Sequence, residues 1–253
     1  MSDTVPLPTP SLVSRIIVLL YGLIAYFIGV AGLACLIAGF GQLLPWGFMN
    51  SAPSSYALVA DVILVAIWGL IHTVMARRPF KQRLTQFIAE PAERSTYVLV
   101  AGITSILLVG LWQPLNGVIW SVADPTLTKV IWGAFVFGWV YLLAATFAIN
   151  HFDLFGLRQV YLNFVNEPRP HIHFMKRAMY KFSRHPIQAG VLIGIWATPH
   201  MTVTQLVLSI GFTVYIFAGL WFEERDLVSH IGEPYEQYRR EAGMFLPKFF
   251  RPN

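Results

Sequence analysis

The chain has 253 residues, of which 56% are hydrophobic and only 12% are charged, and its formal net charge is +5. Soluble domains carry about 25% charged residues. With a mean hydropathy of +0.58, this chain has too few polar side chains to cover a soluble fold, so the composition predicts an integral membrane protein. Its single cysteine excludes a disulfide framework.

The predicted elements follow one another as apolar runs. Residues 1–14 are rich in Pro, Ser and Thr and are expected to form a flexible tail. Four runs then approach or exceed the roughly 20 residues that cross a bilayer. They cover about 16–40, 56–76, 97–113 and 127–149. A shorter run at 187–198 and a full-length run at 202–222 meet at Thr198-Pro199-His200, which predicts the tip of a helical hairpin.

The predicted fold is therefore an all-α polytopic membrane helix bundle, with four full spans, a C-terminal helical hairpin and a cytoplasmic amphipathic tail. We expect a single domain over residues 1–253. Lys and Arg concentrate in 77–94, in 150–186 and after 222, whereas 41–55 and 198–201 contain neither. The positive-inside rule then places both termini in the cytoplasm, most simply at a bacterial inner membrane. Polar chemistry is expected on that side, within residues 150–253.

A basic motif opens the shorter apolar run. Pro186 suits the first turn of a helix, and a helix N-terminus attracts anions. Arg184 and His185 directly precede it, and Arg184 adds a positive charge suited to a carboxylate or phosphate. Gly190 and Gly194 share a helix face and permit close approach of a neighbour. The alternative is a pair of headgroup anchors beside a packing GxxxG motif.

Acidic and aromatic residues follow the last span. Glu223 and Glu224 lie near a helix C-terminus, where acids are unfavourable without a cationic partner or ligand. Ionisable groups at membrane depth favour a functional site, although a solvated helix end is the alternative. Tyr235 and Tyr238 share a helix face and would serve as interfacial anchors or as walls of an aromatic ligand site.

The segment after the fourth span mixes His151, Asp153 and Arg158 with large apolar residues. His171 and His173 form an HxH pair without a third ligand at a convincing spacing, so no metal site is expected. Glycine-rich phosphate loops and GxSxG or HExxH motifs are absent from the sequence.

Taken together, these motifs resemble the membrane methyltransferase superfamily of isoprenylcysteine carboxyl methyltransferases and NnrU-like proteins. Its RHPxYxG pattern, paired acids and Tyr-containing tail correspond here to 184–190, 223–224 and 235–239. The segments ERSTYVL (93–99), FDLFGLRQV (152–160), WATPHMT (196–202) and EERDL (223–227) resemble the methanethiol S-methyltransferase branch. Two departures are Gln188, where the family usually has Tyr, and 203–205, where the branch usually continues with Gly-His.

The resemblance implies S-adenosylmethionine as cofactor and a small thiol, such as methanethiol, as the acceptor that becomes dimethyl sulfide. It implies that Arg184 and the helix N-terminus hold the donor's carboxylate, and that Glu223 or Glu224 meets its cationic end. The cofactor-binding residues implied are Arg184, His185, Pro186, Gln188, Gly190, Glu223, Glu224, Tyr235, Tyr238 and Arg239. The catalytic candidates, which would favour the thiolate, are His185, Arg158, His151 and Asp153.

The sequence is also consistent with other acceptors and with a non-enzymatic role. The acceptor could be hydrogen sulfide, a prenylcysteine carboxylate or a lipid amine, or the protein could be a non-enzymatic NnrU-like membrane protein. Membrane lipid is an expected partner, nucleic acid is not, and the sequence does not indicate the oligomeric state.

Overall fold

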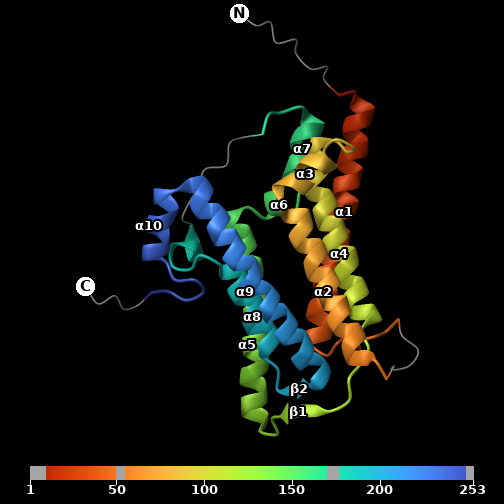
Figure 1. Cartoon of the computed structure of the whole chain (residues 1–253), viewed down its shortest axis with the longest axis vertical. Helices are drawn as coiled ribbons and strands as arrows, with labels where there is room; N and C mark the ends of the chain where they lie inside the picture. The colour runs from red at the N-terminus through yellow and green to blue at the C-terminus, as the bar shows by residue number, and fades with distance from the viewer. Residues whose placement is uncertain (1–9, 50–54, 170–176, 249–253) are drawn as a thin grey trace, which may run out of the picture.

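The computed structural model describes residues 10–49, 55–169 and 177–248 (Figure 1). Its helices are α1 Leu12–Phe40, α2 Ala57–Ala76, α3 Arg78–Leu84, α4 Glu93–Leu111, α5 Pro125–Ile149, α6 His151–Leu154, α7 Leu157–Val165, α8 Pro186–Trp196, α9 Val203–Ile231 and α10 Glu233–Glu241. Two 3-10 turns, Glu90–Ala92 and Ala178–Lys181, and two short strands, β1 Val118–Ser121 and β2 His200–Thr202, complete the described elements. The all-α prediction is confirmed.

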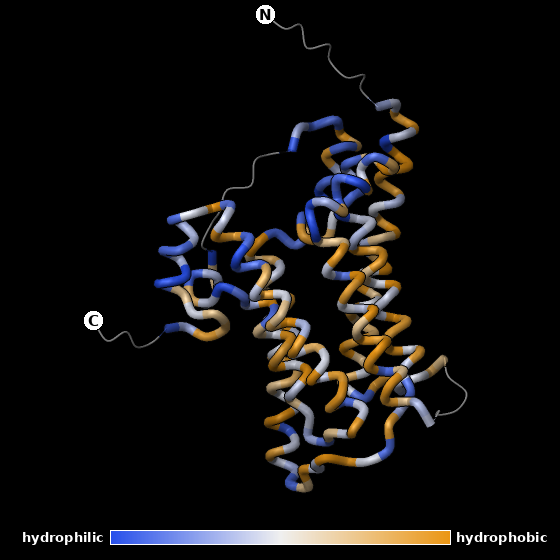
Figure 2. Tube along the Cα trace, viewed as in Figure 1, coloured by the Kyte–Doolittle hydropathy of each residue, from blue (hydrophilic) through white to orange (hydrophobic). Residues whose placement is uncertain are grey.

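Five helices (α1, α2, α4, α5 and α9) are long and apolar enough to cross a membrane. Helix α8 has 11 residues and therefore measures about 16 Å, roughly half of a bilayer core. Figure 2 shows apolar residues along the long helices and polar residues gathered around α3, α7 and α10. The protein is thus an integral membrane protein with four full spans and a C-terminal hairpin of α8 and α9.

Two predicted boundaries are wrong. Helix α1 already begins at Leu12, because the Ser11 side chain caps it by accepting a hydrogen bond from the backbone N–H of Ser14 at 3.2 Å. The expected tail therefore cannot include 12–14, and residues 1–9 lie outside the described residues. Helix α9 continues well past 222 and ends at Ile231. Gly232 follows it with a φ of 71°, a conformation that favours glycine.

Glycines bring the helices together in pairs. Helix α1 packs along α4, and a Cβ added to Gly32 would lie 2.5 Å from the carbonyl oxygen of Gly102. Helix α8 packs along α5, and a Cβ added to Gly190 would lie 2.6 Å from the carbonyl oxygen of Gly138. The close approach expected at Gly190 is therefore that of helix α5 rather than of a ligand. Contacts between α2 and α9 link the two groups of helices (Figure 1).

The hairpin between α8 and α9 breaks at 198–200, as predicted, but its tip is tied to a strand. Strand β2 pairs antiparallel with β1 from the connection between α4 and α5. Gln205, within one of the two departures from the resembled branch, completes a capping box with Thr202 at the start of α9. Its Nε2 also donates to the carbonyl oxygen of Phe40 at 3.1 Å, which gives this departure a structural role.

Candidate functional site

A cavity of about 860 Å³ opens between α2, α3 and α4 on one side and α8 and α9 on the other. It lies at the end of the bundle that holds α3, away from the β1–β2 pair (Figure 1). We call it the charged cavity. Its polar and aromatic lining residues are His72, Thr73, Arg77, Arg78, Arg94, Tyr97, Gln188, Tyr215, Glu223, Asp226 and His230.

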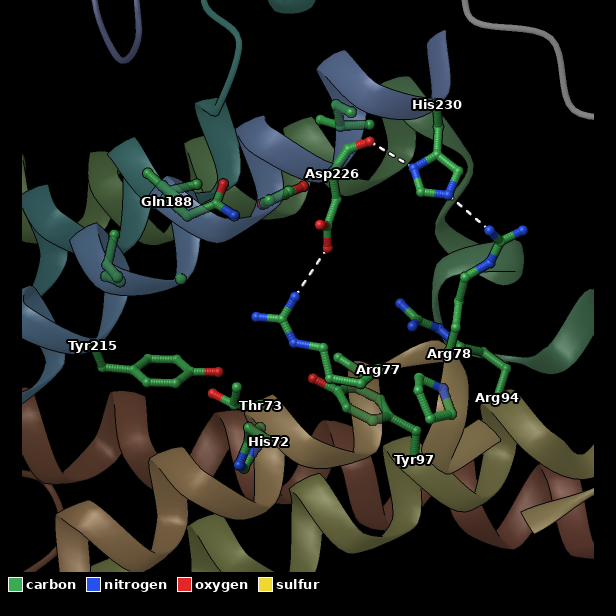
Figure 3. Close-up of a pocket in the computed structure, with 17 residues that line it drawn as sticks. His72, Thr73, Arg77, Arg78, Arg94, Tyr97, Gln188, Tyr215, Asp226 and His230 are labelled. Carbon is green, nitrogen blue, oxygen red and sulfur yellow. Dashed lines mark hydrogen bonds and ion pairs between the residues drawn. The ribbon is translucent and has the colours of Figure 1, made fainter. Parts of the chain in front are cut away.

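Two pairs of residues connect α2 and α3 with α9 across this cavity (Figure 3). Arg77 Nη1 donates to Asp226 Oδ2 at 2.9 Å, and Arg78 Nη1 lies 2.7 Å from His230 Nε2. The Arg77 and Asp226 side chains are 36% and 61% exposed. Ion pairs this exposed contribute only about 0–1 kcal/mol, so a charged ligand could exchange them at little cost.

Arg94 and Glu223 place opposite charges on the two walls of the charged cavity. Arg94 Nε donates to the Leu154 carbonyl oxygen at 2.7 Å, and its guanidinium lies 5.0 Å from the centre of the Tyr97 ring. In the described part of the chain, Glu223 has neither a hydrogen bond nor an ion pair, and its side chain is exposed. The charged cavity therefore contains the Arg94 guanidinium, which is fixed by a hydrogen bond, and the Glu223 carboxylate, which has no such partner among the described residues.

The segment before α8 is bound to the end of α9 by a buried cluster of charges. Glu224 Oε1 accepts a hydrogen bond from Arg184 Nε at 2.6 Å and lies 3.0 Å from His185 Nε2. Its other oxygen lies 3.2 Å from Arg239 Nε. Arg184 Nη1 also donates to the Ala242 carbonyl oxygen at 2.6 Å. We call these four side chains (Arg184, His185, Glu224 and Arg239) the tail cluster.

Four of the predicted cofactor-binding residues thus contact one another: Arg184, His185, Glu224 and Arg239. Arg184 and Glu224 are 8% and 9% exposed, and each already holds a charged partner. Arg184 and Arg239 border a second, open cavity of about 660 Å³ on the tail. Of the predicted cofactor-binding residues, only Gln188 and Glu223 line the charged cavity.

The two tail tyrosines are buried beneath the end of α9. Tyr235 and Tyr238 are 2% and 4% exposed and pack against apolar residues at the end of α9. The Tyr238 hydroxyl donates to the carbonyl oxygens of Tyr180 and Ser183, at 2.6 and 3.1 Å. Burial raises the pKa of Tyr238 to about 12, so the hydroxyl keeps its proton and remains a donor. In the described structure both rings lie among the packed residues of the tail.

The catalytic candidates after α5 form a separate cluster. His151 is 5% exposed, and its ring nitrogens lie 2.9 Å from Thr146 Oγ1 and 3.0 Å from Tyr26 Oη. Burial lowers the pKa of His151. Arg158 Nη1 donates to Asp153 Oδ2 at 2.7 Å. None of these three predicted residues is among those that line the charged cavity.

This cluster nevertheless positions part of the cavity wall. Helix α6 ends at Leu154, whose carbonyl oxygen holds Arg94, and the loop that follows packs against the start of α4. This loop carries Gly156, at a φ of 83°, where an added Cβ would lie 2.7 Å from the backbone nitrogen of Ser95. The two resembled segments at 93–99 and 152–160 are thereby packed against each other, and the first of them presents Arg94 and Tyr97 to the cavity.

Sequence reasoning missed most of the cavity. Arg77 and Arg78 were interpreted only as topology signals, and Arg94 only as one of these and as part of the ERSTYVL resemblance, although all three line one wall. His72 carried a usable signal, since an ionisable residue within a membrane span indicates function by default. The described residues contain no cluster of three or more potential metal ligands. His171 and His173 lie outside the described residues.

Comparisons with known proteins agree with the resemblance. A protein from Mycobacterium tuberculosis named methanethiol S-methyltransferase is 39% identical over 92% of this chain and 97% of its own length. A protein of that name from Crocosphaera subtropica is 40% identical over 94% of each chain. Nurim from Danio rerio is 24% identical over 72% of this chain and 70% of its own. No solved structure matches the chain. The family profile described as NnrU protein matches residues 61–246, and the chain belongs to this NnrU protein family.

Proposed function

We propose that this protein is a membrane S-methyltransferase that transfers a methyl group from S-adenosylmethionine to methanethiol and releases dimethyl sulfide. The observation that supports methanethiol as the acceptor is the similarity to relatives named methanethiol S-methyltransferase. This similarity extends over more than nine-tenths of this chain. The charged cavity supports the methyl donor, because its volume and lining match a ligand of that size and charge.

The lining residues fit the donor. A cavity of about 860 Å³ lies within the roughly 300–1,000 Å³ that enclose small ligands. Arg94 and Arg77 suit the α-carboxylate, and Glu223 suits the α-ammonium or the sulfonium. Tyr97 and Tyr215 supply aromatic faces for the adenine or for a cation–π contact with the sulfonium.

The tail cluster has a positioning role in this proposal. By joining the start of α8 to the end of α9, it sets the distance between Gln188 and Glu223, which both line the cavity. Direct contacts between the donor and the other implied cofactor-binding residues remain a prediction.

The bound donor would supply a methyl group attached to a sulfonium sulfur. That sulfur leaves readily as a neutral thioether. The chain's own contribution is to orient the acceptor in line with that methyl group and to exclude water. Methanethiol is small and apolar, so it can reach the cavity from the bilayer as well as from water. The basic residues at the cavity end support a cytoplasmic location for this site, because Lys and Arg concentrate on the cytoplasmic side of membrane proteins.

The test uses purified protein in detergent with S-adenosylmethionine and methanethiol, followed by headspace gas chromatography. We expect dimethyl sulfide that depends on both compounds, and much less of it from Glu223→Gln. Binding of the donor without dimethyl sulfide would contradict methanethiol as acceptor, and labelled-methyl assays with hydrogen sulfide, a prenylcysteine or a lipid amine would then identify another. Absence of donor binding at millimolar concentration would contradict an enzymatic role.

A further inference from the structure

His72 is a titratable residue of the charged cavity to which the proposed function assigns no role. It lies on α2, within a membrane span, and is 9% exposed. Its Nδ1 lies 2.7 Å from the carbonyl oxygen of Trp68. A carbonyl oxygen only accepts hydrogen bonds, so Nδ1 carries the proton of the neutral ring. Nε2 is then left with a free lone pair.

The ring is held in place by aromatic neighbours. It packs against Trp68, with ring centres 4.1 Å apart, and it meets the Tyr97 and Tyr215 rings edge to face, with ring centres 6.1 and 6.5 Å away. Trp68 is fixed in turn by a hydrogen bond from its Nε1 to Ser105 Oγ at 3.1 Å. Within the described residues, Nε2 of His72 has no hydrogen-bond partner, so a ligand in the cavity is free to take that place.

The other possible proton acceptors of the charged cavity are less suited to this task. Asp226 is paired with Arg77, and Nε2 of His230 lies against Arg78. Glu223 is unengaged, but the proposed function gives it to the cationic end of the donor. His72 alone, among the described lining residues, combines a free nitrogen lone pair with an aromatic surrounding that suits a small apolar thiol.

We propose that Nε2 of His72 takes the proton of the acceptor thiol during methyl transfer, an inference that rests on the proposed function. A bond forms between the thiol sulfur and the methyl carbon, while the bond from that carbon to the sulfonium sulfur breaks and leaves its electron pair on that sulfur. The S–H proton moves to Nε2, so the positive charge passes from the sulfonium to the imidazolium. After the products leave, water that enters the opened cavity takes the proton from Nε2.

A base is needed because thiols have pKa values near or above about 8.5 and are mostly protonated at neutral pH. General bases of this kind accelerate reactions by about 10²–10⁴-fold. His72→Gln is therefore expected to lower kcat/KM for methanethiol by about 100-fold or more. Trifluoroethanethiol is a small thiol that is more acidic and needs less help in losing its proton. The same variant should lose less than about 10-fold with it.

The experiment compares wild type, His72→Gln, His72→Ala and a control, His200→Gln, whose side chain lies at the opposite end of the bundle near Ser121. Calorimetry with S-adenosylhomocysteine should show the same affinity in all four proteins. Added imidazole should restore methanethiol methylation to His72→Ala only. The pH profile of kcat/KM should lose its acidic limb in His72→Gln, which leaves in place the other charged and titratable groups of the cavity: Arg77, Arg78, Arg94, Tyr97, Tyr215, Glu223, Asp226 and His230.

A second measurement needs no active variant. In wild-type protein with labelled histidine, the nitrogen resonances of His72, assigned by comparison with His72→Gln, should report the Nδ1–H tautomer and shift when methanethiol is added. An Nε2–H tautomer would overturn the proposal, as would equal losses with both thiols or no loss with methanethiol. Wild type that methylates no thiol would overturn the proposed function as well, whereas an active wild type with an unaffected His72→Gln would overturn the role of His72 alone.

Discussion

The neighbouring acids Glu223 and Glu224 should respond to substitution in opposite ways. The Glu224 side chain is 9% exposed and contacts three basic side chains of the tail cluster. Glu223 is exposed to the charged cavity. These two acids are adjacent in the sequence, yet one holds the fold together and the other, we propose, binds the donor.

The magnitude follows from burial. Glu224→Ala would leave the Arg184 guanidinium, only 8% exposed, without its carboxylate. Removing one partner of a buried ion pair costs about 3–5 kcal/mol. For a chain of this size we expect Tm to fall by about 6–20 °C. Glu223→Gln removes no folded-state partner, so its free energy of unfolding should change by less than about 0.5 kcal/mol.

Binding should show the reverse pattern. A hydrogen bond to a charged group contributes about 1.5–3 kcal/mol. Glu223→Gln should therefore weaken S-adenosylmethionine binding by about 10–100-fold, measured by calorimetry in detergent without acceptor. Thermal unfolding of the same preparations supplies the stability values. In the double variant Arg184→Ala with Glu224→Ala, the losses should total less than the sum of the single losses.

Two results would contradict these predictions for Glu224 and Glu223. A Glu224→Ala protein as stable as wild type would mean that the tail cluster does not hold α8 to α9. A Glu223→Gln protein that binds S-adenosylmethionine with unchanged affinity would mean that the charged cavity does not hold the donor's cationic end as proposed.

Three further predictions concern the helix contacts, the buried histidine and the cavity wall. Gly32→Ala should lower the free energy of unfolding by about 1–3 kcal/mol, because its Cβ would meet the backbone of α4 at 2.5 Å; a neutral effect on Tm would contradict the close packing of α1 and α4. Burial lowers the pKa of His151, so the unfolded chain binds this proton more readily and stability should fall as pH drops below about 6.5. His151→Gln should show a shallower fall, and parallel pH profiles of Tm would argue against this. Arg94→Gln should weaken S-adenosylhomocysteine binding about 10-fold or more, with Arg83→Gln, which does not line the charged cavity, as the control expected to bind normally.

Much of the architecture could be predicted because membrane insertion depends on local composition. An apolar run of sufficient length forms a spanning helix wherever it occurs, since the bilayer interior requires every backbone N–H and C=O to be bonded within the helix. The spans, their order and the hairpin break near Pro199 followed from that rule. The helix ends were less certain, because a cap such as Ser11 or a continuing polar turn such as 223–231 does not change the apolar pattern.

Local composition and motifs were therefore enough to predict the membrane class, the spans, the side on which polar groups collect and the family resemblance. They could not predict which of those polar groups contact one another. The tertiary structure joined Arg184 to Glu224, buried Tyr235 and Tyr238 in the tail, and set His72 and Arg94 opposite Gln188 and Glu223. The physical reason is that side chains far apart in the sequence meet only through helix packing, and packing depends on close contacts such as Gly190 against Gly138, whose partner the local pattern does not specify.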